Sequence, residues 1–330
     1  MTGQATRYEI LEKLREAEGG LVSGGELAAA LGVSRTAVWK QIAALAEEGY
    51  RIETAANKGY RLLGGDVYSG YEVSRRLQTG RLGRPLIFLE TVDSTNEYVK
   101  KIAAEGAADG TVVLARRQTS GRGRLSRQFE SPPDSGVYLT ILLRPDIAVA
   151  DLTLVTLLAA VAAAGAVEEL SGVRPGIKWT NDLFLGGRKI CGILTECAVE
   201  GESGRVSYAA VGIGTNLLQE EGDFPEELRG VAGSVRMGSG VKVAPADYAA
   251  ALLRHFERLF FGEKFPENRE GLLARYRKDL FFLGKEIRVV GLREEYPAVA
   301  LDIDGEGRLL VRREDGTVTA LNSGEISVRF

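Results

Sequence analysis

The order of elements in the first 65 residues most constrains what this chain can fold into. Ile10, Leu11 and Leu14 are spaced as one face of a helix, and residues 26–31 form a second, short helical segment. A third helix is expected over residues 35–45, only three residues after the second. Two helices joined by so tight a turn are typical of a helix-turn-helix, whose later helix enters the major groove of DNA.

The turn and a following hairpin support this interpretation. Gly32 suits the left-handed position that ends a helix, and Ser34 is the expected N-cap of the next one. Residues 50–53 and 59–62 alternate like the strands of a hairpin, with Lys58 near its tip as part of a basic wing. The expected DNA contacts lie near the start of the third helix and on the wing: Ser34, Arg35, Thr36, Ala37, Trp39, Lys40 and Lys58.

A three-helix bundle without a DNA role is the alternative, in which Val38, Ile42 and Leu45 face inward simply as a core. The net charge of this segment does not distinguish the two interpretations, because it carries eight Lys/Arg and eight Asp/Glu up to Leu63. The sequence of helix, turn, helix and basic hairpin is more specific than any single part, and it favours DNA binding.

Composition excludes several other classes. A net charge of −3 argues against general nucleic-acid binding by the whole chain. No apolar run approaches a membrane span and the N-terminus lacks a signal-peptide core, so we expect a cytoplasmic protein with no membrane partner. Cys191 and Cys197 are expected as reduced core residues rather than a disulfide or zinc ligands. His255, the one histidine, lies in an amphipathic pattern and is expected to be structural, and no bound metal is expected.

Strands and helices alternate through the middle of the chain. Strands are expected at residues 86–92, 112–115, 136–143, 177–185, 188–196 and 208–216, with an alanine-rich helix at 157–170. Ser94 and Glu97 form a capping-box pattern, so a helix is expected to start there and run to Gly106. Gly186-Gly187 is the expected hairpin turn between two of the strands.

The loop at residues 120–127, Ser-Gly-Arg-Gly-Arg-Leu-Ser-Arg, places arginines on a flexible backbone. Glycines let a backbone approach an anion, and guanidinium groups bind phosphate oxygens in pairs. Arg122 and Arg124 are two residues apart, so in an extended loop they would face the same way and converge on one anion. A strand follows this loop, and the Gly-Lys-Ser/Thr of a Walker A loop is missing from it.

Two later strands carry further candidates. Lys189 faces one side of the strand at 188–196, and Gly192 leaves room for a ligand against its backbone. Residues 212–216, Gly-Ile-Gly-Thr-Asn, are weak evidence alone, and no helix follows them, so a dinucleotide-binding fold is rejected. Together the middle of the chain offers four fixed cations and a carboxylate: Arg122, Arg124, Lys178, Lys189 and Asp182.

Such a site suits a phosphate-bearing ligand. With no histidine base within reach, chemistry there would proceed by positioning and charge neutralisation. Attack of an already ionised carboxylate on the α-phosphorus of ATP fits, because that nucleophile needs no deprotonation.

These motifs together resemble the bifunctional biotin–protein ligase and biotin-operon repressor family along nearly the whole chain. The matching segments are residues 34–40, 57–60, 93–96, 121–124, 178–182, 188–194, 212–216 and 324–329. The resemblance departs from the family pattern at Leu125, Ser126 and Phe129, where Arg-Gly and later a tryptophan are usual. It departs again at Thr180, where the family has proline in Lys-Trp-Pro-Asn-Asp.

The resemblance implies a role for each site residue. Implied catalytic residues are Lys189, Arg122, Arg124 and Asp182. Implied biotin contacts are Ser94, Thr95, Asn96, Gln118, Gly121, Arg122, Gly123, Arg124, Lys189, Gly192 and Gly214. Implied ATP contacts are Arg122, Arg124, Lys178, Asn181, Asp182, Lys189, Asn216 and Arg329.

The last fifty residues are expected to form a small β unit. Short alternating strands are expected at residues 285–290, 298–303, 309–312 and 317–321, with turns at 304–305, 315–316 and 323–324. The pattern suggests a small barrel, and the resemblance implies an SH3-like one. The expected fold is thus an α/β (α+β) multi-domain chain: a winged helix-turn-helix at 1–65, a mixed-sheet ligase domain at 66–280 and the β-barrel at 281–330.

The activity implied by the resemblance has two stages. Biotin, ATP and Mg²⁺ would give biotinyl-5′-AMP, and biotin would then pass to one lysine of the biotin carboxyl carrier protein of acetyl-CoA carboxylase. The adenylate-bound form would pair as a homodimer and bind operator DNA. Two alternatives stay open: a lipoate or octanoate ligase with the same acyl-adenylate chemistry, and a DNA-binding sensor whose ligase domain only binds ligand. The operator sequence, the need for ligand in dimerisation and the ordering of residues 219–239 are left undetermined.

Overall fold

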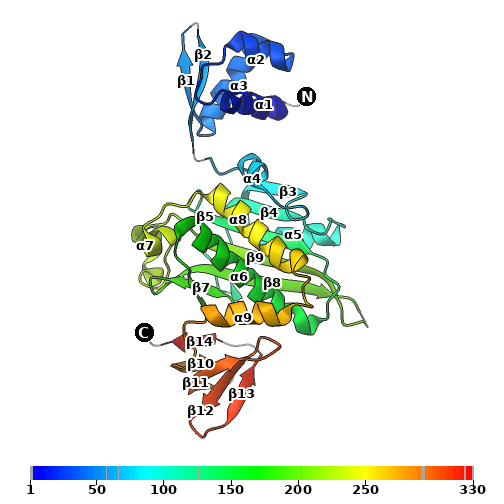
Figure 1. The fold of residues 1–330 in the computed structure, drawn as a ribbon, viewed down its shortest axis with the longest axis vertical. Coiled ribbons are helices and arrows are strands. Elements are labelled where there is room, and N and C mark those ends of the chain that lie inside the picture. Colours follow the sequence, from blue (N-terminus) through cyan, green and yellow to red (C-terminus); the bar gives the residue numbers. More distant parts are fainter. Residues whose placement is uncertain are drawn as a thin grey trace. The chain divides into compact units, whose positions relative to one another are not determined.

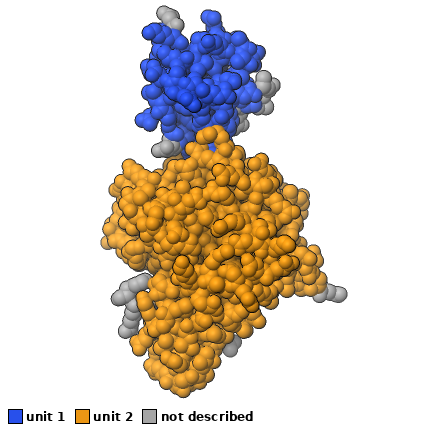
Figure 2. Space-filling view, in the orientation of Figure 1, with its two compact units in different colours: residues 1–72 blue, residues 73–330 orange. Residues whose placement is uncertain are grey.

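The computed structural model describes residues 3–56, 58–65, 67–124, 127–201, 203–290, 294–322 and 325–328. The chain divides into two compact units, Met1–Glu72 and Val73–Phe330 (Figures 1 and 2).

The first unit has the element order that the sequence predicts. It contains α1 (Gly3–Glu16), α2 (Gly24–Leu31), α3 (Arg35–Glu47), and an antiparallel hairpin of β1 (Arg51–Ala55) and β2 (Gly59–Gly64). Gly32 ends α2 with a φ of +64°, which glycine adopts without strain. Ser34 caps α3, since its side chain accepts a hydrogen bond of 3.1 Å from the backbone N–H of Ala37.

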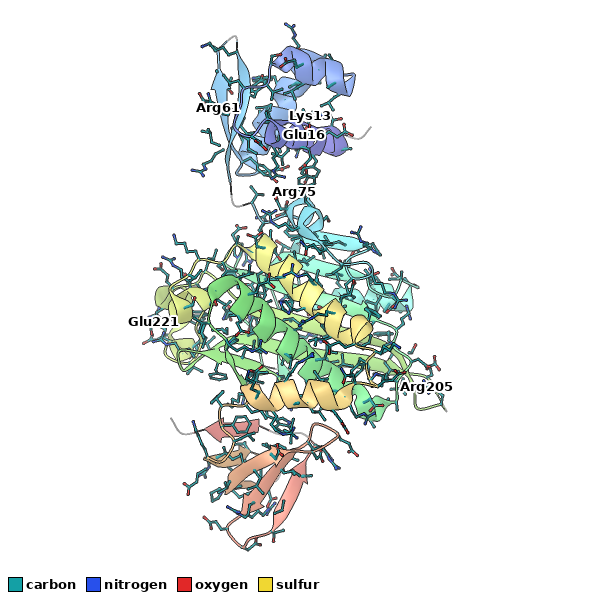
Figure 3. All side chains as sticks on the ribbon, viewed as in Figure 1. Lys13, Glu16, Arg61, Arg75, Arg205 and Glu221 are labelled. Carbon is teal, nitrogen blue, oxygen red and sulfur yellow. The ribbon has the colours of Figure 1, made fainter. Side chains whose placement is uncertain are left out.

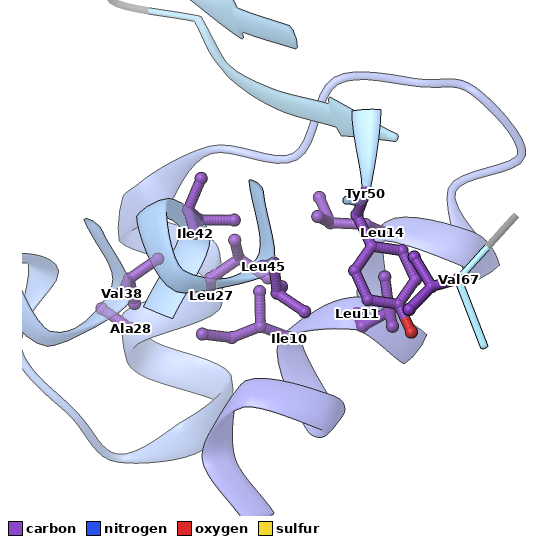
Figure 4. Packing of buried hydrophobic residues seen from close by; sticks show 10 residues of the cluster. All are labelled: Ile10, Leu11, Leu14, Leu27, Ala28, Val38, Ile42, Leu45, Tyr50 and Val67. Atoms are coloured by element: carbon purple, nitrogen blue, oxygen red, sulfur yellow. The ribbon is translucent and has the colours of Figure 1, made fainter. Parts of the chain in front are cut away.

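The core of this unit joins all three helices to the hairpin and is drawn in Figure 4. Ile10, Leu11 and Leu14 of α1 are fully buried against Val38 and Leu45 of α3. Each such side chain contributes about 1.5–3 kcal/mol when it leaves water. The inward faces predicted for α1 and α3 are therefore confirmed.

The second unit is built on a seven-stranded mixed sheet in the order β3-β4-β5-β9-β8-β7-β6. Its strands are β3 (Leu86–Val92), β4 (Val112–Gln118), β5 (Gly136–Leu143), β6 (Gly176–Lys178), β7 (Asp182–Leu185), β8 (Arg188–Val199) and β9 (Val206–Asn216). The β3–β4 pair is parallel and all other pairs are antiparallel. Its helices are α4 (Gly70–Arg76, which begins in the first unit), α5 (Thr95–Ala104), α6 (Leu152–Ser171), α7 (Val235–Ser239), α8 (Pro245–Glu257) and α9 (Arg269–Asp279).

The two faces of this sheet have different coverings. Val99 and Ala103 of α5 pack on Val113, Leu142 and Ala210, which project from one face. On the opposite face, α6 and α8 lie across the sheet (Figure 1). Because strand side chains alternate, the residues spaced by two from Leu142 and Ala210 share the α5 face.

Three local expectations were wrong. The strand predicted over residues 177–185 is two strands, β6 and β7, which pair with each other across a turn at residues 179–181. The alanine-rich helix α6 begins at Leu152, five residues before the predicted start at 157. Ser94 is the N-cap of α5, but the capping box is absent: its side chain makes no capping hydrogen bond. The carboxylate of Glu97 pairs with Arg122 and Lys100, and the backbone N–H of Ser94 donates to Asp93 instead.

The predicted hairpin turn and the structural histidine are confirmed. Gly186 and Gly187 have φ values of +59° and +76°, as a tight hairpin turn requires. His255 on α8 packs against Gly165 of α6, and its Nε2 lies 2.8 Å from a carboxylate oxygen of Glu169. Cys191 is buried and burial raises the pKa of its thiol to about 12, which agrees with an inert core residue. Cys197 is only half-buried, so the expectation of a core residue was wrong for it.

One apolar segment is longer than expected. In the described part of the chain, the helix at residues 149–171 is long and apolar enough to cross a membrane, contrary to the expectation that no run approached that length. However, 67% of its most apolar window is buried inside the fold, where it packs on the sheet, α8 and α9. A buried core helix can have the same length and hydropathy, so these two properties alone do not identify residues 149–171 as a membrane span.

The C-terminal residues form an antiparallel sheet in the order β13-β12-β11-β10-β14. Its strands are β10 (Glu286–Val290), β11 (Glu295–Ile303), β12 (Leu309–Arg313), β13 (Val318–Leu321) and β14 (Glu325–Val328), and the last of these was not predicted from the sequence. Arg277 of α9 pairs with Asp302 of β11 at 2.5 Å, which ties this sheet to the helix before it.

Candidate functional site

A pocket of about 270 Å³ lies on the α5 face of the seven-stranded sheet. It collects almost all the residues that the sequence singled out in the middle of the chain. Its lining includes Ser94, Thr95, Asn96, Gln118, Arg122, Gly123, Arg124, Lys178, Asn181, Asp182, Lys189, Gly192, Gly214 and Asn216. Gly121 is outside this lining but within the same loop, and Arg329 lies outside the described residues.

The start of α5 and the end of β4 form one polar wall of the pocket. Gln118 accepts hydrogen bonds through Oε1 from both the backbone N–H and the hydroxyl of Thr95, at 2.9 and 3.0 Å. Its Nε2 donates to Ser131 Oγ at 2.9 Å. Ser94 is only 2% exposed, and its N–H donates to the Asp93 carboxylate. This wall is therefore fixed before any ligand arrives.

A second wall is bare backbone. Gly192 of β8 and Gly214 of β9 are paired across the two strands. The ring of Phe129 lies on them: a Cβ on Gly214 would be 2.7 Å from Phe129 Cε1, and one on Gly192 would be 3.3 Å from Cε2. A flat apolar group can thus lie directly against the sheet at this point, as the absence of side chains predicted.

The arginine loop does not aim both guanidinium groups at one place. Arg122 forms an ion pair with Glu97 on α5. Arg124 donates to Thr180 Oγ1 at 3.1 Å and to Asn181 Oδ1 at 3.0 Å. The expected convergence on one point is not seen in this structure, because the loop curls back: the N–H of Gly123 donates to the carbonyl of Arg127 at 2.7 Å, so the backbone is not extended.

The remaining charges gather on the neighbouring strands. Lys189 Nζ lies 2.7 Å from Asp182 Oδ1, which links β8 to β7. Lys178 Nζ lies 5.6 Å from the centroid of the Phe184 ring, a cation–π contact. The pocket therefore presents several cations together with the carboxylates of Asp182 and Glu130, and its cations can bind and neutralise phosphate oxygens.

Residues 219–239 cover one side of the pocket through apolar side chains that were not predicted as site residues. Phe224, Leu228, Val231 and Ala232 are part of its lining. The sequence signal that could have identified them is the presence of apolar residues in a segment with little regular secondary structure. The segment is tied to β9 because Asn216 Nδ2 donates to the carbonyl of Gly233 at 3.1 Å. Glu221 in the same segment pairs with Arg188 at 3.2 Å (Figure 3).

A partly buried network beside the pocket was also missed. Asn96 Nδ2 donates to Glu196 Oε2 at 2.9 Å, and Lys100 Nζ lies 2.9 Å from the other oxygen of that carboxylate. Burial alone would raise the pKa of Glu196, but the hydrogen bonds from Lys100 and Asn96 hold it below its ordinary value. No short sequence motif links residues a hundred positions apart, so only the fold reveals this contact.

In the first unit, the candidate DNA contacts are mostly on the surface. Ser34, Arg35, Thr36, Lys40 and Lys58 are exposed, and Ala37 is half-buried. Trp39 is 59% exposed, a large apolar side chain left in water on α3. The structure thus leaves these side chains accessible to a partner.

Family models match three parts of the chain. Residues 6–61 match a helix-turn-helix domain, residues 88–216 match the biotin/lipoate A/B protein ligase family, and residues 282–329 match the biotin protein ligase C-terminal domain.

Similarity to characterised proteins extends over nearly the full length. The chain is 36% identical over 311 residues to the bifunctional ligase/repressor BirA of Bacillus subtilis, covering 94% of this chain and 95% of that one. It is 28% identical to BirA of Escherichia coli, over 95% and 94% of the two chains. The biotin protein ligase of Aquifex aeolicus, solved in complex with biotin and ATP, superposes with a TM-score of 0.62 at 28% identity, covering 74% of this chain and 98% of that one. The chain therefore belongs to the biotin protein ligase family, among its bifunctional ligase/repressors.

Proposed function

We propose that this protein is an ATP-dependent biotin–protein ligase and a repressor of biotin genes. It makes biotinyl-5′-AMP and transfers biotin to one lysine of the biotin carboxyl carrier protein of acetyl-CoA carboxylase. The observation that carries the ligase proposal is a single pocket that combines a side-chain-free wall at Gly192 and Gly214 with the cations Arg124 and Lys189.

In the first step, the fused ring system of biotin lies against the glycine wall, which requires the Phe129 ring to shift. Its polar ring atoms face the Thr95 and Gln118 side, and its carboxylate points to Lys189. The ionised carboxylate attacks the α-phosphorus of ATP, an acyl–phosphate bond forms and pyrophosphate leaves. Lys189 and the loop arginines offset the charge that builds on the phosphorus oxygens.

Mg²⁺ enters with ATP as part of the substrate. Among the residues that the structure describes, no group of three or more His, Cys, Asp or Glu side chains could hold a metal ion. The phosphates of the nucleotide supply the ligands that Mg²⁺ prefers, so a dedicated protein cage is not required.

In the second step, the amine of the acceptor lysine attacks the acyl carbon of the adenylate. An amide forms and AMP leaves. Asn181 and Asp182, at the start of β7, lie on the side of the pocket where ATP and this lysine meet. Biotinyl-AMP is a reactive mixed anhydride, so the loop at 121–131 and the segment at 219–239 protect it from water.

The remaining site residues take the roles inferred from the sequence. Asn96, Gly121 and Gly123 complete the biotin side, and Lys178, Asn216 and Arg329 complete the ATP side. In the regulatory state, the adenylate-bound protein forms a homodimer in the cytoplasm. Its two α3 helices and hairpins then contact operator DNA. The C-terminal sheet closes as an SH3-like barrel, and the three domains divide near residues 65 and 280.

One experiment tests the ligase proposal. The protein is incubated with ATP, Mg²⁺ and labelled biotin, with and without a carboxyl carrier domain, and parallel samples contain lipoate or octanoate instead. We expect biotin to reach the carrier lysine and the other acids not to. Transfer of lipoate or octanoate would favour the related acyl ligases, while ligand binding without adenylate would favour a non-enzymatic sensor.

A further inference from the structure

The turn between β6 and β7 is anchored by distant parts of the second unit. The indole Nε1 of Trp179 donates to the carbonyl of Gly307, in the C-terminal sheet, at 2.9 Å. The hydroxyl of Tyr276 on α9 donates to the carbonyl of Thr180 at 2.8 Å. Trp179 and Tyr276 are both buried, so these anchors hold the turn in a dry environment where hydrogen bonds are strong.

The same turn is tied to the sheet through Asn181. Its Nδ2 donates to the carbonyl of Ile193 at 2.9 Å, and the N–H of Ile193 donates back to the carbonyl of Asn181 at 3.0 Å. Since one end of the amide is committed to β8, the other end, Oδ1, is fixed in direction. It faces Arg124, which donates to it at 3.0 Å.

Thr180 adds a second acceptor for the same guanidinium nitrogen. Its hydroxyl oxygen lies 3.1 Å from Arg124 Nη1, and the residue is 7% exposed. The family pattern has proline at this position, and proline carries no side-chain oxygen. A threonine therefore gives this chain an acceptor for the loop arginine that the usual residue would not supply.

We propose that Thr180 is a positioning residue for Arg124. A guanidinium group has donors on three nitrogens, so the anchored turn can hold one of them while the group contacts an anion. An arginine held in place loses less freedom when it binds the ligand. Thr180 thereby slows the escape of the acyl-adenylate, an inference that rests on the proposed function because that adenylate must be made.

The test compares release of preloaded, labelled biotinyl-AMP from four proteins: wild type, Thr180→Val, Thr180→Ser and Thr156→Val. The control residue Thr156 bonds Thr195 through its hydroxyl on the α6 side of the sheet, away from the pocket. We expect release about fivefold faster for Thr180→Val, because a hydrogen bond to a charged group is lost. Thr180→Ser restores the wild-type rate and Thr156→Val keeps it.

The decisive measurement repeats Thr180→Val in an Arg124→Gln background, because a residue that acts only through Arg124 has no effect once the guanidinium is gone. We expect less than a twofold change there. An equally large effect in both backgrounds, or wild-type release by Thr180→Val, would overturn the positioning role. Failure of the wild-type protein to form any adenylate would overturn both this inference and the ligase proposal, so the two failures are distinguishable.

Discussion

Lys189 Nζ and Asp182 Oδ1 are 2.7 Å apart, although Lys189 pairs in register with Phe184 and Asp182 with Gly192. The contact is diagonal across the β7–β8 ladder, and a register irregularity between Leu183 and Phe184 accompanies it. The ammonium is thereby held beside the backbone of Gly192, where a Cβ would come 3.4 Å from Nζ. A cation fixed next to a bare stretch of strand is placed to meet a ligand carboxylate or phosphate.

Lys189→Ala should therefore slow formation of biotinyl-AMP by about a hundredfold or more, since a preorganised charge contact is lost where charge develops. Single-turnover assays with ATP and biotin measure this rate. Arg205→Ala is the matched control, because Arg205 pairs with Asp146 away from the pocket (Figure 3). Adenylation at the wild-type rate by Lys189→Ala would remove this residue from the mechanism.

Gly212→Ala should destabilise the fold and disturb the pocket lining at Asn96. A Cβ at this position would collide with the side-chain oxygen of Asn96, which also lies 2.7 Å from Thr140 Oγ1. Overpacking of this kind typically costs about 1–3 kcal/mol of unfolding free energy, and we expect biotin affinity to fall as well. Urea unfolding and biotin titration measure the two effects. Gly201→Ala, with nothing within 4 Å of the added carbon, should match wild type in both.

Lys58→Ala should weaken binding to every DNA sequence alike and lower the salt slope of binding by about one, as expected for the loss of one phosphate contact. Electrophoretic or fluorescence titrations at several salt concentrations give the slope. Lys13→Ala removes a cation that is paired with Glu16 on α1 and serves as the control (Figure 3). An unchanged slope for Lys58→Ala would place the hairpin tip away from the DNA backbone.

Glu196 should make the free energy of unfolding depend on pH in the acid range. Its pKa is held below the ordinary value of 4.5 in the folded protein, since hydrogen bonds from Lys100 and Asn96 outweigh burial. The unfolded chain then binds more protons, so the stabilisation is complete above about pH 4.5 and is lost as the pH falls through the lower, folded pKa.

We expect Glu196→Gln to lower the unfolding free energy at pH 7 by about 1 kcal/mol, allowing for partial solvent screening. The difference in unfolding free energy between wild type and Glu196→Gln should become smaller as the pH drops below 4.5. Urea unfolding at pH 7, 5 and 4 measures it. A gap of the same size at all three pH values would show that the charge of Glu196 contributes nothing.

Several features of this protein follow from the sequence because short-range physics sets them. The cap at Ser34, the left-handed Gly32 and the hairpin glycines at 186 and 187 each depend on neighbours only a few residues away. The glycine wall at 192 and 214 could also be anticipated, because a missing side chain in a strand has few other uses. These local signals predicted the helix-turn-helix and most of the strands. The fold then brings most of the candidate site residues into one pocket, whereas their roles stay predictions.

Tertiary structure decided what local patterns could not. The break between β6 and β7 falls at a turn that is held by Gly307 and Tyr276, both about a hundred or more positions away in the chain. Asn181 and Asp182 favour turns, but this local signal did not by itself separate the two strands. Ser94 precedes α5 as its N-cap, but the expected capping box does not form, and the carboxylate of Glu97 pairs with Arg122 and Lys100. The directions of Arg122 and Arg124 were likewise set by acceptors on α5 and on the β6–β7 turn. A flexible charged side chain takes the partner that folding brings nearest, and its neighbours in sequence do not specify that partner.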